Sequence, residues 1–294
     1  MKIAMIGFGE ASQALAAGWR SASAELPQLP ISTYDIKYHG DLRANLQLAC
    51  RQFNVHCATG PDEAVANSRL IFSLVTADQA VEAAISASAT IMRGAHYLDC
   101  NSCAPSTKQQ AAQIIASAGG HYIDVAVMAP IHPARHRTPL LIASERAQEA
   151  HRLLEALDMN ANVVGTEIGQ ASAIKMLRSV MIKGLEALSA ECILAARQAG
   201  VEDAVIASLQ ASDPGIQWQK RLSYNLERMM VHGTRRAAEM REAAKTLQDL
   251  HLPNRITSAV IDWQSQIGAF EAQAGADNLH DRADCLLHHL GAHD

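Results

Sequence analysis

The sequence predicts an α/β domain, built on a doubly wound and mostly parallel sheet, that is followed by an all-helical domain. Short apolar runs alternate with helical segments over residues 2–165, which is the pattern of parallel strands joined by crossover helices. The strand-like runs then stop near Gly165, and helical patterns fill the remainder of the chain. We therefore expect two domains, covering residues 1–165 and 166–294.

The first strand, turn and helix form one unit. Residues 2–6 are a short apolar strand, residues 12–19 are helical, and the turn between them begins with Gly7-Phe8-Gly9. The first glycine permits a tight turn and the second lets the backbone approach a pyrophosphate, whose charge is favoured by the N–H groups of the following helix. The usual third glycine is a serine here. This GxGxxS turn predicts a Rossmann domain whose dinucleotide contacts are Gly7, Phe8, Gly9, Glu10, Ala11 and Ser12.

The second strand, residues 31–35, ends in Asp35. An acidic side chain at this position bonds the two ribose hydroxyls of the adenosine half and repels a 2′-phosphate. We therefore expect NAD to be favoured over NADP as the cofactor, with Lys37 softening that preference. The alternative is a Rossmann-like sheet without a cofactor, in which Asp35 is only a turn residue.

The remaining strands of the sheet end near polar residues that we expect to meet around the nicotinamide. Strands are expected at residues 55–57, 69–75, 96–100, 122–127, 140–143 and 163–164, with helices at 41–53, 61–66, 76–89, 105–118 and 145–157. Ligands of a doubly wound sheet lie at the carboxyl ends of its strands. Thr76, Asn101 and Ser102, together with the segment after Val127, should therefore converge there.

The second half of the chain is predicted to be helical throughout. Helices are expected at residues 169–197, 202–211, 217–230, 234–250, 254–272 and 278–290. The first of them would be about 45 Å long at roughly 1.5 Å per residue, and its apolar residues lie on several faces. Such a helix is difficult to bury within one subunit, so we expect a homodimer formed through the helical domain.

Composition and charge exclude several classes of function. The net charge is −5 and there is no long basic run, so nucleic acid is not an expected partner. The chain has no apolar stretch near the roughly 20 residues of a membrane span, and its start lacks the features of a signal peptide. Its six cysteines are scattered and its 13 histidines show no metal-ligand spacing, so we expect a cytoplasmic protein with reduced thiols and no metal site.

Three further segments carry motifs that occur in the same order in one enzyme superfamily. Residues 99–105, D-C-N-S-C-A-P, resemble the D-x-S-T-x-x-P loop of the β-hydroxyacid dehydrogenases and the G-N-S loop of their relative, 6-phosphogluconate dehydrogenase. Residues 124–130, D-V-A-V-M-A-P, occupy the place of that family's D-A-P-V-S-G-G substrate loop. Residues 169–175, G-Q-A-S-A-I-K, are similar to its G-x-G-x-x-x-K helix start. With the cofactor turn, the resemblance spans the chain in order.

This resemblance implies an NAD(P)-dependent dehydrogenase that oxidises a small hydroxy acid or sugar acid by hydride transfer. It gives the role of general acid/base to Lys175, which stands at the place of the family's catalytic lysine. The resemblance also implies a small anionic substrate. The substrate contacts that it implies are Asn101, Ser102, Met128, Ala129 and Pro130.

The sequence departs from this family at several positions. M-A-P replaces S-G-G at residues 128–130, which alters the backbone cradle for a substrate carboxylate, and Asn101 replaces a serine. R-S at residues 178–179 stands in place of paired asparagines, and the family's K-D pair is lost around residues 239–240. We therefore expect a divergent branch with its own helical C-terminal domain and a substrate other than hydroxyisobutyrate.

The position of Lys175 has a chemical rationale of its own. It lies one to two turns into a helix that we expect beneath the cleft between the domains, where desolvation favours the neutral amine. A neutral amine there can take the hydroxyl proton as hydride leaves the carbinol carbon for the nicotinamide. Arg178, one turn further, is a candidate substrate contact that could clamp a carboxylate or phosphate. The alternatives are a surface lysine and an ion pair of Arg178 across the dimer.

Two basic clusters are secondary candidates for the substrate site. They comprise His132, Arg135, His136 and Arg137, and His232, Arg235 and Arg236. The first cluster follows the substrate-loop segment and the second opens a C-terminal helix, although a basic loop is more often simply solvated.

Two other functions are alternatives to a dehydrogenase. An imine or ketone reductase would share the fold, but such relatives usually lack the lysine that stands at position 175. A non-catalytic, dinucleotide-binding sensor would account for the loss of the S-G-G and K-D elements.

Overall fold

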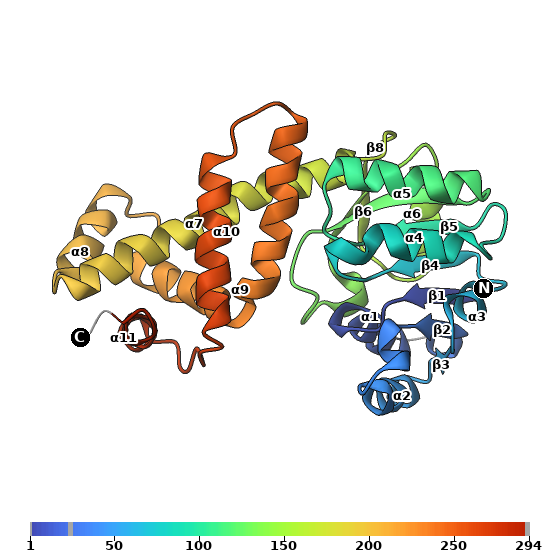
Figure 1. Ribbon diagram of the computed structural model, residues 1–294, viewed down its shortest axis with the longest axis horizontal. Helices are drawn as coiled ribbons and strands as arrows, with labels where there is room; N and C mark the ends of the chain where they lie inside the picture. The colour runs from blue at the N-terminus through green and yellow to red at the C-terminus, as the bar shows by residue number, and fades with distance from the viewer. Residues whose placement is uncertain (1, 23–25, 292–294) are drawn as a thin grey trace. The chain divides into compact units, whose positions relative to one another are not determined.

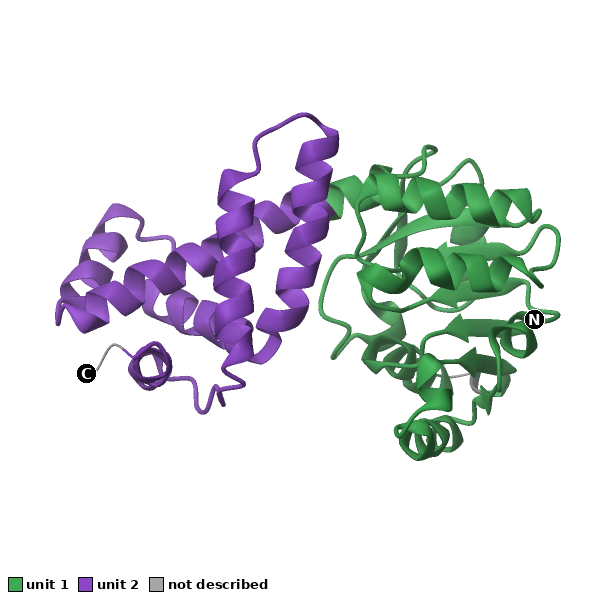
Figure 2. Ribbon diagram, viewed as in Figure 1, with its two compact units in different colours: residues 1–175 green, residues 176–294 purple. Residues whose placement is uncertain are grey.

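The computed structural model describes residues 2–22 and 26–291, and it divides into two compact units, residues 1–175 and 176–294 (Figure 2). Unit 1 contains the β-sheet and unit 2 is helical. The domain division predicted after residue 165 falls at the end of the last strand, whereas the unit boundary falls within the long helix that follows.

Over the described residues, the sheet of unit 1 has eight strands in the order β3-β2-β1-β4-β5-β6-β7-β8 (Figure 1). They are β1 (Ile3–Ile6), β2 (Ile31–Tyr34), β3 (His56–Cys57), β4 (Leu70–Ser73), β5 (His96–Asp99), β6 (His121–Val127), β7 (Leu140–Ala143) and β8 (Ala161–Gly165). Neighbouring strands are parallel except β6 and β7, which are antiparallel. Because the order grows outward from β1 on both sides, the predicted doubly wound, mostly parallel sheet is confirmed.

Helices cover both faces of this sheet. The helices α1 (Glu10–Arg20), α2 (Arg43–Gln52) and α6 (Ala147–Glu155) share a hydrophobic cluster with Ile3 and Met5 of β1. The helices α3 (Pro61–Val65), α4 (Ala80–Ser88) and α5 (Pro105–Ser117) share a second cluster with Ala4 and Ile6, which point to the opposite face. Double coverage explains why the residues of β1, β4 and β5 are all buried.

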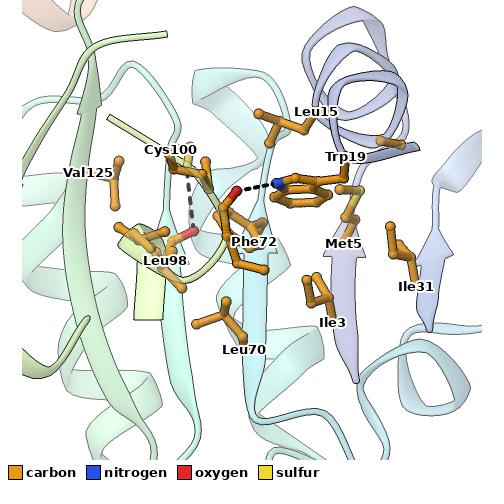
Figure 3. Close-up of a cluster of buried hydrophobic side chains, with 14 of the residues drawn as sticks. Ile3, Met5, Leu15, Trp19, Ile31, Leu70, Phe72, Leu98, Cys100 and Val125 are labelled. Carbon is orange, nitrogen blue, oxygen red and sulfur yellow. Dashed lines mark hydrogen bonds between the residues drawn. The ribbon is translucent and has the colours of Figure 1, made fainter. Parts of the chain in front are cut away.

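The larger cluster packs around Trp19 of α1. Its indole Nε1 donates a 3.0 Å hydrogen bond to the carbonyl of Leu157, and its ring lies 5.7 Å from that of Phe72 on β4, measured between centroids. Figure 3 shows these two rings among apolar side chains of the central strands. A buried tryptophan with its N–H satisfied fixes a helix firmly, so α1 and the glycine turn before it are held against the sheet.

Unit 2 contains most of α7 (Gln170–Gln198), which begins in unit 1, with α8 (Glu202–Ser212), α9 (Trp218–Asp249), α10 (Arg255–Ala269) and α11 (Leu279–His289). Its core is a cluster of side chains from α7, α9, α10 and α11. The predicted helical second half is thereby confirmed. Within residues 2–22 and 26–291, the helices are too short or too polar to cross a membrane.

The prediction of separate helices at residues 217–230 and 234–250 is wrong, because α9 runs without a break through Gly233. A Cβ on Gly233 would lie 2.5 Å from the carbonyl oxygen of Gln264, and one on Gly268 would lie 2.3 Å from the amide nitrogen of Thr234. Both close approaches join α9 to α10. These glycines therefore permit a tight helix crossing, and the helix does not end there.

Candidate functional site

The glycine turn between β1 and α1 has the shape of a phosphate cradle. Gly7 has a φ of +87°, and a Cβ there would lie 2.4 Å from the carbonyl oxygen of Leu74, so no other residue fits without distortion. Gly9 caps α1 without a side chain, and a Cβ there would meet no atom within 4 Å. The space beside this helix N-terminus therefore suits a pyrophosphate.

Ser12 fastens this turn to the helix. It is fully buried, and its Oγ donates a 2.7 Å hydrogen bond to the carbonyl of Gly7. The residue that replaces the usual third glycine thus adds a bond that glycine cannot make. Glu10 and Ala11 lie in the first turn of α1, with Glu10 exposed and Ala11 half-buried. Backbone N–H groups of this turn are the groups suited to hold a phosphate.

Asp35 lies at the end of β2, directly beside the glycine turn. Its Oδ2 accepts a hydrogen bond of 2.8 Å from the N–H of Phe8, and its Oδ1 accepts one of 2.9 Å from the N–H of Lys37. The carboxylate is nearly buried and is held from both sides. Each oxygen of an ionised carboxylate retains acceptor capacity, so Asp35 can bind the ribose hydroxyls of a dinucleotide.

Asn101 joins the carboxyl ends of β4 and β5. Its Oδ1 accepts a 2.7 Å hydrogen bond from the N–H of Val75, and its Nδ2 donates a 2.9 Å bond to the Oγ of Ser73. Thr76 follows directly and is exposed at the start of a short 3₁₀ turn. The structure therefore places Thr76 and Asn101 close together, with the Asn101 amide already engaged inside the protein.

The structure brings Lys175 and Ser102 into contact. The Nζ of Lys175 donates a 2.7 Å hydrogen bond to the Oγ of Ser102, and both side chains are half-buried. Ser102 follows β5, whereas Lys175 lies in the second turn of α7. A basic and a hydroxylic side chain therefore converge at the same edge of the sheet as the glycine turn. This pairing is the central feature of the candidate site.

Asp124 on β6 fixes the helix that carries Lys175. It is fully buried, and its Oδ2 accepts hydrogen bonds of 3.0 Å from the N–H groups of both Gly169 and Ser172. The Oγ of Ser172 donates a further bond of 3.1 Å to the same oxygen. Asp124 thus satisfies free N–H groups and supplies a negative charge at the start of α7, as a helix N-terminus requires.

Lys108 is a site residue that sequence reasoning missed. It lies on α5, is fully buried, and its Nζ donates to the carbonyl and the Oδ1 of Asp99, at 2.5 and 3.0 Å. The Nζ also lies 3.7 Å from the Oδ1 of Asp124. Burial alone would lower the pKa of Lys108, but Asp99 and Asp124 outweigh it and hold that pKa above its usual value.

Residues 128–130, which come directly after β6, are the last part of the predicted substrate loop. The N–H of Met128 donates a 2.9 Å hydrogen bond to the carbonyl of Pro139, while Ala129 and Pro130 are exposed. On α7, Arg178 is exposed one turn after Lys175. The structure thus leaves Ala129, Pro130 and Arg178 accessible.

Residues of both basic clusters contact carboxylates of their own units. His136 packs against Gly18 of α1, and it shares Asp158 with Arg137. In unit 2, Arg236 is buried against Glu186, at 2.6 and 2.7 Å. The charges of Arg137 and Arg236 are thus balanced by carboxylates within their own units, whereas His132 and Arg135 are exposed.

The thiols and histidines form no metal centre among the described residues, which hold no group of three or more His, Cys, Asp or Glu suited to a metal ion. Cys100 and Cys103 are both buried and form no disulfide, and burial raises the pKa of the Cys100 thiol to about 12.

A glycine cradle before α1, an acid at the end of β2 and a doubly wound sheet together define a Rossmann-type NAD(P)-binding domain. Residues 2–169 match the family model for the NAD binding domain of 6-phosphogluconate dehydrogenase, and the chain belongs to that family. Residues 196–267 match a domain of unknown function, DUF1932. The suspected membership of a branch with its own helical C-terminal domain is thereby confirmed.

Known proteins resemble most or nearly all of the chain. A conserved hypothetical protein from Sinorhizobium meliloti 1021 is 33% identical, with a TM-score of 0.77, and the match covers 98% of this chain and 96% of that one. An uncharacterized 28.5 kDa protein of Methanothermus fervidus is 25% identical over 83% of this chain and 90% of its own. Mycobacterium tuberculosis 3-hydroxyisobutyrate dehydrogenase, with L-serine, is 13% identical with a TM-score of 0.74, covering 97% and 98%, and shows likeness of fold.

Proposed function

We propose that this protein is an NAD(P)-dependent dehydrogenase that oxidises the alcohol group of a small hydroxy acid or sugar acid. The observation that carries this proposal is the hydrogen bond between Lys175 and Ser102 at the carboxyl edge of the NAD(P)-binding sheet. The shared fold of a 3-hydroxyisobutyrate dehydrogenase supports the same reaction class.

Lys175 is the general acid/base of the proposed reaction. In the oxidation, the carbinol carbon loses a hydride and its oxygen loses a proton to the neutral amine of Lys175. A nicotinamide supplies the hydride acceptor when the cofactor is bound. While Lys175 donates to Ser102, the hydroxyl hydrogen of Ser102 remains available to a substrate oxygen. Ser102 thus orients both the lysine and the substrate.

Asp35 favours NAD over NADP in this proposal. Its carboxylate is held by the N–H groups of Phe8 and Lys37, so it cannot swing away from an incoming 2′-phosphate. The carboxylate of Asp35 and a 2′-phosphate beside it would repel each other strongly, because Asp35 is nearly buried and water screens the two charges poorly. Lys37 is exposed beside Asp35 and offsets part of this repulsion.

Residues 128–130 and the guanidinium of Arg178 are the proposed substrate contacts. Within residues 128–130, Ala129 is the exposed residue with an N–H to offer to an anionic group, because the N–H of Met128 is bonded to Pro139 and Pro130 has none. Arginine binds carboxylates and phosphates with two parallel hydrogen bonds, which gives orientation as well as affinity. The six cysteines of the chain form no disulfide among the described residues, which suits the reducing conditions of the cytoplasm, the compartment that we propose.

We further propose that α7 forms a homodimer interface with a second copy of the chain. Leu177, Met181, Leu185 and Leu188 are 42%, 65%, 37% and 64% exposed. Their spacing of three or four residues places them in one stripe along the helix. Gly184 lies within that stripe, and a Cβ there would meet no atom within 4 Å. A glycine among large apolar residues suits close packing of two helices. When a two-fold axis relates two copies of the chain, the stripe of one copy packs against the same stripe of the other.

The experiment that tests the enzymatic proposal is a panel of hydroxy acids and sugar acids with NAD⁺ and NADP⁺, followed by the absorbance of the reduced cofactor. Wild-type protein should turn over at least one acid faster with NAD⁺, and Lys175→Met should abolish turnover while calorimetry shows unchanged cofactor binding. Lys220→Met, which removes an exposed lysine of α9, is the matched control and should keep full activity. An active Lys175→Met protein would overturn the role of that lysine. Cofactor binding without turnover of any acid would favour a sensor or a reductase.

A further inference from the structure

We propose that Lys108 is a positioning residue that sets the geometry between Ser102 and Lys175 by holding two buried carboxylates together. The catalytic consequence of this inference rests on the proposed function, whereas its structural part does not. The ammonium of Lys108 contacts Asp99, Asp124 and the carbonyl of Val125. It therefore acts on Ser102 and Lys175 indirectly, through the two carboxylates.

Asp99 and Asp124 occupy paired positions on the neighbouring parallel strands β5 and β6. Both side chains are fully buried. Two like charges directly opposite each other on adjacent strands repel, and burial strengthens that repulsion because water does not screen it. The ammonium of Lys108 lies against both carboxylates, at 3.0 Å from Asp99 and 3.7 Å from Asp124. This lysine therefore makes the pairing of the two strand ends possible.

Asp99 controls the path of the chain toward Ser102. Its Oδ1 accepts a 2.9 Å hydrogen bond from the N–H of Asn101 as well as the bond from Lys108, and its Oδ2 accepts a 2.6 Å bond from the hydroxyl of Tyr122. The backbone carbonyl of Asp99 accepts a further bond from Lys108. The turn that presents Ser102 is thus anchored from both the side chain and the backbone of Asp99.

Asp124 controls the start of α7. Its Oδ2 holds the N–H groups of Gly169 and Ser172, and Ser172 lies one helical turn before Lys175. Its Oδ1 has no hydrogen-bond partner among the described residues, and the charge that faces it is that of Lys108. The position of Lys175 therefore depends on a carboxylate whose charge Lys108 balances.

Loss of the ammonium would leave two buried carboxylates in register without a cation. The strand ends would separate, or one carboxyl would take up a proton and release its N–H donors. Either response moves Ser102 relative to Lys175. A displacement of about 1 Å at a catalytic group costs on the order of 100-fold in rate.

The test compares Lys108→Met with the control Ile115→Ala. Ile115 lies seven residues further along α5 and is equally buried, but it contacts the hydrophobic cluster instead of the carboxylates. Amide hydrogen exchange is followed by mass spectrometry at a temperature where both variants are folded. Lys108→Met should speed exchange in residues 100–104 and 169–175 by roughly tenfold or more, and Ile115→Ala should not single out these segments. Equal behaviour of the two variants would overturn the proposal.

A second variant covers the case in which Lys108→Met does not fold. Lys108→Met combined with Asp124→Asn removes the repulsion, and the asparagine oxygen still accepts from the start of α7. This protein should fold and lose exchange protection in residues 100–104 while residues 169–175 remain protected. Wild-type protection in both segments would contradict the role of Lys108.

Activity separates this inference from the proposed function. With an acid that wild-type protein oxidises, Lys108→Met or the double variant should lower kcat by about tenfold or more, with cofactor affinity unchanged and the pH profile of kcat altered. Ile115→Ala should keep kcat and its pH profile. An inactive wild-type protein would refute the proposed reaction, and the exchange experiment would still decide whether Lys108 positions the two segments.

Discussion

The Nζ of Lys175 and the Oγ of Ser102 are 2.7 Å apart, although 73 residues separate them in the chain. One follows a strand and the other lies in the second turn of a helix, so neither position alone predicts the contact. The pairing means that the proposed base is oriented by a hydroxyl group within unit 1. Removing that hydroxyl is therefore the most direct test of the geometry.

Ser102→Ala should lower kcat while leaving dinucleotide binding intact, because the lysine remains but loses its orienting partner. The expected loss is about 10- to 100-fold, at or below the lower end of the range for general acid/base contributions, because the lysine itself remains. Steady-state kinetics with the best acid of the panel and calorimetric titration of NAD⁺ would measure the two effects. Ser117→Ala, at an exposed site on α5, is the control and should match wild type. Equal kcat for the two variants would contradict the role of Ser102.

The two glycines of the cofactor turn should respond differently to the same substitution. Gly7→Ala places a Cβ against the carbonyl of Leu74 in a backbone conformation that alanine disfavours, so it should lower the thermal midpoint. Gly9→Ala meets no protein atom and has an ordinary φ of −81°, so it should keep the midpoint and weaken NAD⁺ binding. Thermal melts and calorimetry on both variants would check this. Unchanged affinity in Gly9→Ala would argue against a phosphate beside that glycine.

The glycine turn, Asp35 and the strand ends could be predicted because their signals are local. A glycine turn between an apolar strand and a helix specifies its own conformation within a dozen residues. The contact of Lys108 could not be predicted in that way. Lys108 shares a helix face with Ala111 and Ile115, and a charge on an apolar face was a signal in the sequence. Its partners depend on the register of β5 against β6, which no local pattern specifies.

Long-range packing also explains why one helix prediction failed and how two residues of a basic cluster are held. Gly233 has the local character of a helix end, but the close approach of α10 determines that α9 continues through it. The basic residues around His136 follow the substrate-loop segment in sequence. Within that cluster, His136 and Arg137 both contact Asp158, and the His136 ring fills the space that Gly18 leaves on α1. In both cases the arrangement depends on a tertiary contact that no local pattern specifies.

The α7 stripe predicts a dimer that a single charge can disrupt. Met181→Asp places a carboxylate at an exposed position of the stripe, so it should leave the monomer folded and convert the dimer to a monomer. Light scattering coupled to size-exclusion chromatography would measure the mass, with circular dichroism as the check on folding. Gln248→Asp is the matched control, because it adds the same charge elsewhere on the surface of unit 2 and should remain dimeric. A monomeric wild-type protein would refute the interface.

The buried lysine should also shape stability at alkaline pH. The folded pKa of Lys108 is raised above its usual value of 10.5, so the folded state keeps a proton that the unfolded chain releases. Its contribution is complete below the unfolded pKa and is lost as the pH rises through the folded pKa. Wild-type protein should therefore lose stability above about pH 10, and Lys108→Met should do so less steeply.

Burial raises the pKa of Tyr122 in the same way, and the neighbouring Asp99 raises it further. Tyr122→Phe should therefore also flatten the loss of stability at alkaline pH. Thermal midpoints measured by circular dichroism at intervals from about pH 8 to 11 would compare the slopes. The Ile115→Ala variant lowers stability without removing a titrating group, so its curve should lie below that of wild type and parallel to it. A Lys108→Met curve that also runs parallel to wild type would mean that the ammonium is not held by the two carboxylates.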